Sequence, residues 1–74
     1  MTCRVGMTTN PGERKRYWEK KHSNLRNWKI LGHYKSKSKA QEAERIFAQK
    51  YGCVSYSGGR GNEHDDWVVY KFNY

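Results

Sequence analysis

The run DWVVYKFN at residues 66–73 constrains the fold of this chain more than any other segment. Its residues favour β-structure, and the adjacent Val68 and Val69 make it apolar on both faces. Successive side chains of a strand point to opposite faces of a sheet, so a strand of this kind needs cover on both sides. The run therefore predicts a strand inside a sheet rather than a strand at its edge.

Three further segments are predicted to be strands. In the middle segment, Trp28, Ile30 and Tyr34 share one face, with Gly32 between them on that face. The last segment is followed by the loop SGGRGNEHD, which predicts that it forms a hairpin with the C-terminal run. These strands are expected at residues 3–7, 28–35 and 53–57.

The first predicted helix begins with an N-terminal capping pattern. Asn10 suits the N-cap, Pro11 suits the first helical position, and Glu13 suits the position that closes a capping box. The helix is expected to run to about His22 and is unusually basic. Its apolar contacts are expected from Tyr17 and Trp18.

The second predicted helix begins at Ser38, with Gln41 at the capping-box position. Apolar side chains recur along it at helical spacing, and Gly52 is placed to end it. This combination makes it the best-determined element of the chain. The apolar positions are Ala40, Ala43, Phe47 and Tyr51.

The elements follow the order strand, helix, strand, helix, strand, strand. They predict one α/β (α+β) domain over residues 1–74, with a small mixed β-sheet and two flanking helices. A chain of 74 residues buries roughly 60% of its unfolded surface, which is enough for one modest core.

No part of the chain is typical of a membrane span or a signal peptide. No apolar run approaches the roughly 18 residues of a transmembrane helix, and the start MTCRVGM has no apolar signal core. We therefore expect a cytoplasmic protein without a membrane partner. In that reducing compartment Cys3 and Cys53 are expected to remain two reduced thiols in small buried positions, and the Cys and His residues are too scattered to favour a zinc site.

The positive charge is confined to the first half of the chain. Residues 1–39 hold eleven Lys and Arg against two acids, whereas residues 40–74 hold four against five, for a formal net charge of +8. Aromatic residues are interleaved with these cations. Such a pattern favours a protein that binds the phosphate backbone of a nucleic acid.

The segment around Arg4-Val5-Gly6 resembles the GIY-YIG nucleases. In that family a strand ending in Tyr-Ile-Gly leads through a short loop into a helix that carries the catalytic Arg, eight positions after the Gly. Here the loop TTNP follows, and Arg14 stands eight positions after Gly6. The resemblance implies that Arg14 binds the scissile phosphate, a task that suits a bidentate guanidinium.

A second match lies on the later helix. The segment AERIFAQKY at residues 43–51 is similar to the family's metal-binding helix at Glu44 and at the closing Lys-Tyr. The resemblance implies that Glu44 binds one Mg²⁺ or Mn²⁺ ion, for which a carboxylate is a suitable hard ligand.

The family's first strand, with its Gly-Ile-Tyr motif, has no counterpart before Cys3, and Arg4 replaces the tyrosine of the second motif. We hypothesise that the C-terminal run lies antiparallel to residues 3–7 and replaces the missing strand, as in a circular permutation. Tyr70 is then the candidate for the absent catalytic tyrosine, with Tyr74 and Tyr17 as alternatives.

Three functions remain open. The first is a metal-dependent endonuclease acting on DNA, with Arg14, Glu44 and Tyr70 as catalytic residues. The second is a non-catalytic nucleic-acid-binding module on the same scaffold. The third is a small phage-type protein that docks on a nucleic-acid enzyme. A homodimer or a partner protein is also expected, because so small a domain covers little nucleic acid. The expected phosphate contacts are Arg4, Arg16, Lys20, Lys21, Arg26, Lys35, Lys37 and Arg60, with Lys29 and Lys39 beside them.

Overall fold

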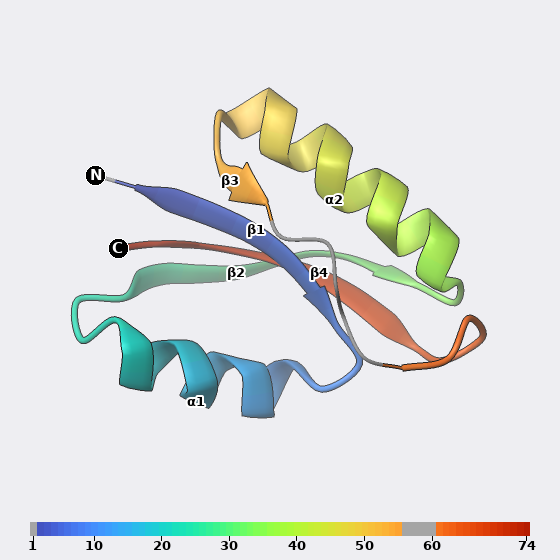
Figure 1. Cartoon of the computed structure of the whole chain (residues 1–74), viewed down its shortest axis with the longest axis horizontal. Coiled ribbons are helices and arrows are strands. Elements are labelled where there is room, and N and C mark those ends of the chain that lie inside the picture. The colour runs from blue at the N-terminus through green and yellow to red at the C-terminus, as the bar shows by residue number, and fades with distance from the viewer. Residues whose placement is uncertain (1, 56–60) are drawn as a thin grey trace.

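A computed structural model of the chain describes residues 2–55 and 61–74 (Figure 1). β4 pairs antiparallel with both β1 and β2, and β1 pairs parallel with β3, in the strand order β2-β4-β1-β3. The predicted mixed sheet with two helices is therefore confirmed. The elements are β1 (Cys3–Thr8), α1 (Pro11–Lys21), β2 (Arg26–Tyr34), α2 (Lys37–Tyr51), β3 (Val54–Ser55) and β4 (Trp67–Asn73).

β4 is an inner strand, as its sequence predicts. Val68 and Val69 are both buried although they point to opposite faces. The strand lies antiparallel to β1, with Tyr70 opposite Gly6, which confirms the hypothesised pairing with residues 3–7. The predicted hairpin between residues 53–57 and 66–73 is wrong, because β1 lies between β3 and β4. A strand that is apolar on both faces is better covered between two long neighbours than beside the two described residues of β3.

The two helices lie on opposite faces of the sheet (Figure 1). β1, β2 and β3 run parallel to one another, so α1 and α2 both belong to crossover connections. These crossovers run across the sheet in opposite directions, and connections of one hand then place their helices on opposite faces. The α2 face of the sheet carries Val5, Met7, Trp67 and Val69, which pack with Ala40 and Ala48 of α2. The α1 face carries Arg4, Gly6, Tyr70 and Phe72, which lie near Trp18 of α1.

The capping predictions are partly confirmed at both helices. The Asn10 side chain accepts a hydrogen bond from the Glu13 backbone N–H at 3.2 Å, as expected. Glu13 does not close the predicted capping box, because the Asn10 backbone N–H donates to Thr8 Oγ1 at 3.1 Å and the Glu13 carboxylate accepts from the Asn10 side-chain amide. Gly52 ends α2 in the left-handed conformation, with φ of 66°. However, the N-cap of α2 is Ser36 rather than Ser38. The Ser38 backbone N–H is instead bound by the carboxylate of Glu63, a residue distant in sequence that local capping rules do not include.

A β-bulge in β2 overturns the expectation that Trp28 and Tyr34 share one face. The register of β2 against β4 shifts between Ile30 and Gly32. Trp28 stacks on Tyr70 on the α1 face, with ring centroids 4.7 Å apart, whereas Tyr34 packs against the core of the α2 face. An extra residue in one strand turns every side chain after it to the opposite face of the sheet. The alternation of faces expected from the sequence is therefore broken within β2.

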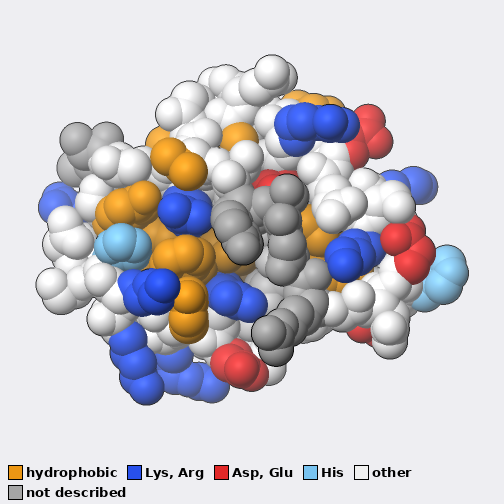
Figure 2. All heavy atoms as spheres, in the orientation of Figure 1, with side chains coloured by type: hydrophobic (Ala, Val, Ile, Leu, Met, Phe, Trp, Pro, Cys, Tyr) orange, Lys and Arg blue, Asp and Glu red, His pale blue; other side chains and the backbone are white. Residues whose placement is uncertain are grey.

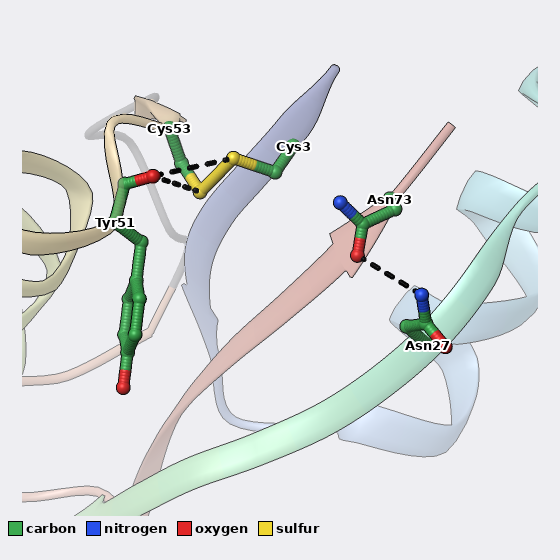
Figure 3. The surroundings of a disulfide bond; sticks show 5 residues. All are labelled: Cys3, Asn27, Tyr51, Cys53 and Asn73. Atoms are coloured by element: carbon green, nitrogen blue, oxygen red, sulfur yellow. Dashed lines mark hydrogen bonds between the residues drawn. A yellow bond between two sulfur atoms is a disulfide. The ribbon is translucent and has the colours of Figure 1, made fainter. Parts of the chain in front are cut away.

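The expectation of two reduced thiols is wrong, because Cys3 and Cys53 form a disulfide (Figure 3). It joins Cys3, the first residue of β1, to Cys53, the residue directly before β3. The two Cα atoms are 4.8 Å apart. The parallel pairing of β1 with β3 brings these two positions together, although they are 50 residues apart in sequence. The Tyr51 carbonyl oxygen lies 3.9 and 3.8 Å from the two sulfur atoms, as a contact without a hydrogen bond because disulfide sulfurs carry no hydrogen.

The first and last described backbones also pair. Thr2 and Tyr74 exchange two backbone hydrogen bonds, of 3.0 and 2.9 Å, which extend the ladder between β1 and β4. Neither of the helices in the described part of the chain is long and apolar enough to cross a membrane.

Candidate functional site

Tyr70 is locked in place at the centre of the α1 face. Its hydroxyl oxygen accepts a hydrogen bond of 2.9 Å from the Trp18 indole N–H, and its ring stacks on Trp28. The ring also lies directly over Gly6, where a Cβ atom would come within 2.5 Å of Tyr70 Cζ. The side chain is only 3% exposed. Glycine at position 6 is therefore required by the close approach of this ring.

Charges from both helices act on the Tyr70 hydroxyl. Burial raises the pKa of Tyr70, and the hydrogen bond from Trp18 opposes this rise. The positive charge of Arg14 also lowers this pKa, whereas the negative charge of Glu44 raises it. Both charges affect the pKa of Tyr70, but Arg14 and Glu44 lie on helices on opposite faces of the sheet (Figure 1) and border separate hollows, so the fold does not bring them to one surface. Since the pKa of Tyr70 is raised, its phenol is protonated at neutral pH.

Glu44 is a buried carboxylic acid on the side of α2 that also buries Ala40 and Ala48. It is 2% exposed, and its Oε2 atom has no hydrogen-bond partner among the described residues. Burial raises the pKa of Glu44 to about 7. An unpaired buried carboxylate is costly, so a helix selected for packing alone would carry an apolar residue here.

A hollow of about 420 Å³ opens beside Glu44. Its oxygen-bearing side chains are of the kind that Mg²⁺ prefers, and this ion needs only one or two carboxylates besides water and a phosphate. The residues present therefore fit a divalent cation. Among residues 2–55 and 61–74, however, no three His, Cys, Asp or Glu side chains gather as a ready-made metal site. The hollow is lined by Ser38, Gln41, Glu42, Glu44, Arg45 and Ser55.

Arg14 lies in the first half of α1, on the other side of the sheet. Its guanidinium carbon is 5.1 Å from the centre of the Tyr17 ring, and the side chain is half-buried. It borders a second hollow of about 310 Å³, which we call the Tyr17 hollow. The residues that line the Tyr17 hollow are Thr8, Thr9, Asn10, Glu13, Arg14 and Tyr17.

Arg4 occupies an unusual position for a cation. Its guanidinium carbon lies 4.8 Å from the centre of the Trp18 ring, and its Nε atom is buried without a hydrogen-bond partner among residues 2–55 and 61–74. Its charge lowers the pKa of Tyr70, as that of Arg14 does. A buried guanidinium nitrogen without an acceptor lowers stability.

The sequence analysis missed the role of Trp18, which holds both Tyr70 and Arg4. Its position four residues after Arg14 is a signal for one shared helix face. The alternative tyrosines lie elsewhere. Tyr74 stacks on His22 with ring centroids 4.0 Å apart, and Tyr17 is exposed on α1.

The basic residues expected to contact phosphate lie in two regions. Figure 2 shows Lys and Arg side chains gathered over α1, beside exposed apolar side chains. Lys35 and Lys37 lie instead at the β2–α2 turn, and the Lys37 ammonium is 5.7 Å from the centre of the Trp67 ring. Arg26 is exposed at the start of β2, and Arg60 lies outside the described residues. The exposed cations of α1 are Arg16, Lys20 and Lys21.

No protein-family model matches this sequence, and comparisons with curated proteins and with solved structures gave no match either.

Proposed function

We propose that this chain is a divalent-metal-dependent nuclease of the GIY-YIG type, with a circularly permuted strand order, that hydrolyses phosphodiester bonds in DNA. One observation carries the proposal. The C-terminal strand pairs antiparallel with β1, and the hydroxyl of Tyr70 on that strand lies within electrostatic reach of both Arg14 and Glu44. The two residues from the sequence resemblance, Arg14 and Glu44, lie on opposite faces of the sheet (Figure 1), and what links them to Tyr70 is the effect of both charges on its pKa.

In this proposal Glu44 holds the cation. A bound Mg²⁺ or Mn²⁺ ion would supply an activated water and would neutralise charge on the phosphate. With a pKa of about 7, Glu44 exchanges its proton readily near neutral pH, and the cation would replace that proton. Arg14 binds the scissile phosphate and stabilises the negative charge that develops on it.

Tyr70 acts as a hydrogen-bond donor. Its hydroxyl oxygen already accepts from Trp18, and its raised pKa keeps its own hydrogen in place at neutral pH. It is therefore suited to orient a phosphate oxygen or a water molecule, rather than to remove a proton from one.

A non-catalytic nucleic-acid-binding module is the second candidate. The observation that favours it is the burial of Tyr70, which is 3% exposed behind Trp18 and Trp28. In that case the cations over α1 would bind phosphates without cleavage, and affinity would fall steeply with salt.

A nicking assay on supercoiled and oligonucleotide DNA with Mg²⁺ or Mn²⁺ tests the proposal. We expect Arg14→Ala and Glu44→Gln each to lower kcat by about 100-fold or more, the usual effect of removing a group that stabilises transition-state charge. Arg16→Ala is the matched control, since it removes the same charge from an exposed position of the same helix. It should change kcat by less than about threefold at saturating substrate.

The opposite result is equally clear. If the Arg14 and Glu44 variants cleave as fast as the wild type, the nuclease proposal is wrong. A wild type that never cleaves but binds DNA with a steep salt dependence would identify the binding module instead.

A further inference from the structure

The packing of the fold does not explain why the aromatic ring of Tyr17 is exposed. It is 42% exposed on α1 and contributes nothing to the core clusters of the sheet. Its ring lies edge-on to Trp18, with centroids 5.0 Å apart, so its orientation is restrained. The cationic groups of Arg14 and Lys21 each lie 5.1 Å from its centre. An exposed aromatic ring beside two cations is a combination on which nucleic-acid bases stack while their phosphates are neutralised.

The Tyr17 hollow has a size and lining that suit one base. Its volume of about 310 Å³ is at the lower end of the range for small-molecule sites. The ring of Tyr17 and the guanidinium of Arg14 border it, and bases stack on both kinds of planar group. Thr9 and Asn10 offer hydrogen-bonding groups to base edges, whereas the carboxylate of Glu13 would repel a phosphate from this end.

The charges around Tyr17 indicate where the phosphates would lie. The nearby Lys21 ammonium is the main cause that lowers the pKa of Tyr17, with further contributions from the charges of Arg14 and Arg4. The local field is therefore positive on the side of these cations and negative at Glu13. A nucleotide would bind with its base in the hollow and its phosphates towards Arg14 and Lys21.

We propose that the Tyr17 hollow holds the base of one unpaired nucleotide next to the scissile phosphate, so that the substrate is single-stranded or carries an unpaired nucleotide at the cleavage site. Bases inside an intact duplex are stacked on their neighbours and cannot enter such a hollow without being extruded. The inference depends on the proposed function only for the position of the scissile phosphate at Arg14. The binding of an unpaired base is a separate property and can be measured without cleavage.

The test is a fluorescence-anisotropy measurement in EDTA with a labelled 15-nucleotide single strand and the duplex of the same sequence, as DNA and as RNA. Loss of one base–aromatic stack corresponds to a loss of affinity of about 5- to 150-fold. We expect Tyr17→Leu to lose this much for the single strand and less than about threefold for the duplex, and Tyr17→Phe to bind as the wild type. The DNA and RNA arms show which backbone is preferred.

Tyr51→Leu is the matched control. Tyr51 is 45% exposed on α2 and also lies near two lysines, with Lys50 and Lys71 at 5.7 and 5.5 Å from its ring centre, but it lines neither of the two hollows described above. This variant should bind both strands as the wild type does. A second control uses a single strand that lacks one base. The wild type should bind this strand more weakly than the intact strand when the missing base is the one that would enter the hollow. Tyr17→Leu should bind the two strands equally well.

Equal losses for single strand and duplex, or no loss for either, would overturn the inference, as would the absence of binding to any nucleic acid. Failure of the two proposals can be told apart. Tyr17-dependent binding of single strands without cleavage would refute the nuclease but keep the hollow. Cleavage that is equally fast on perfect duplex and on substrates with unpaired nucleotides would refute the hollow but keep the nuclease.

Discussion

The two faces of the sheet are built from different kinds of residue. The α2 face is a conventional core of small and branched side chains around Trp67, which is fully buried. The α1 face is aromatic and cationic, with Trp18 and Trp28 against Tyr70 and Phe72, and α1 itself buries none of its residues completely. This difference indicates that α2 provides most of the apolar burial. In contrast, α1 is held by a few oriented aromatic rings and presents its charges to solvent.

Each face also contains one group that packing does not explain. Within the described part of the chain, Glu44 on the α2 side has a buried oxygen without a hydrogen-bond partner, and Arg4 on the α1 side has a buried nitrogen without one. The two charges are opposite, and both act on the pKa of Tyr70. Groups of this kind lower stability unless a ligand completes them, so they mark positions where the fold has been adapted to function.

The contrast predicts that the largest losses of stability come from the α2 face. Trp67→Ala should lower the free energy of unfolding by about 3–5 kcal/mol, because it removes a fully buried ring. It also removes an indole hydrogen bond of 2.8 Å to the Asn62 carbonyl. Ile46→Ala, at a site on α2 that is 53% exposed, should change this free energy by less than about 0.5 kcal/mol. Urea denaturation measures both, and equal effects would show that α2 does not form a core with the sheet.

The disulfide should come next in magnitude. It closes a loop of 50 residues, and the chain-entropy relation for a loop of this length corresponds to about 4 kcal/mol, with 2–4 kcal/mol typical. We expect dithiothreitol to lower the denaturation midpoint of the wild type. The Cys3→Ser, Cys53→Ser double variant should match the reduced wild type and should not respond to the reductant. A wild type that is equally stable in both conditions would show that the two thiols are free in solution.

The pH dependence of stability tests the buried carboxyl of Glu44 on the α2 face. The pKa of Glu44 rises from 4.5 to about 7 on folding, so between these values the native state keeps a proton that the unfolded state has released. Stability therefore falls as pH rises from about 4.5 through 7, by at most about 3 kcal/mol in total.

The wild type should accordingly unfold at lower urea concentration at pH 8 than at pH 5, while Glu44→Gln should show little change. Added Mg²⁺ should recover part of the loss at pH 8 in the wild type alone, because a cation stabilises the charged carboxylate. A Glu44→Gln variant with the same pH dependence as the wild type would show that another group titrates.

Much of the fold could be predicted from the sequence because its signals are local. The caps at Asn10 and Gly52 and the two-sided β4 are decided by residues close to one another. The errors have long-range causes. Glu63 completes the start of α2 from another part of the chain, and the pairing of β1 with β3 brings the two cysteines together. Neither contact leaves a periodic signal in the sequence.

The candidate site shows the same division. The spacing from Gly6 to Arg14 is local, and it led to an arginine that does lie near Tyr70. The spacing could not show that Arg14 and Glu44 approach from opposite faces, because this follows from the directions of two crossovers. It also could not identify Trp18 as the donor to Tyr70, because that contact joins residues 52 positions apart.

On the α1 face, we expect a modest loss of stability that is accompanied by a large effect on the site. Gly6→Ala places a Cβ atom within 2.5 Å of the Tyr70 ring, so the ring has to move away from Trp18. Overpacking of this kind costs about 1–3 kcal/mol of unfolding free energy.

Gly12→Ala is the control, since its Cβ would meet only Asn10 Oδ1, at 3.9 Å. Alanine in a helix should raise the free energy of unfolding by up to about 1 kcal/mol. If the α1 face exists to position Tyr70, Gly6→Ala should remove nearly all cleavage at a temperature where it remains folded by circular dichroism, and Gly12→Ala should cleave normally. A folded Gly6→Ala protein with wild-type cleavage would show that Tyr70 only packs the α1 face.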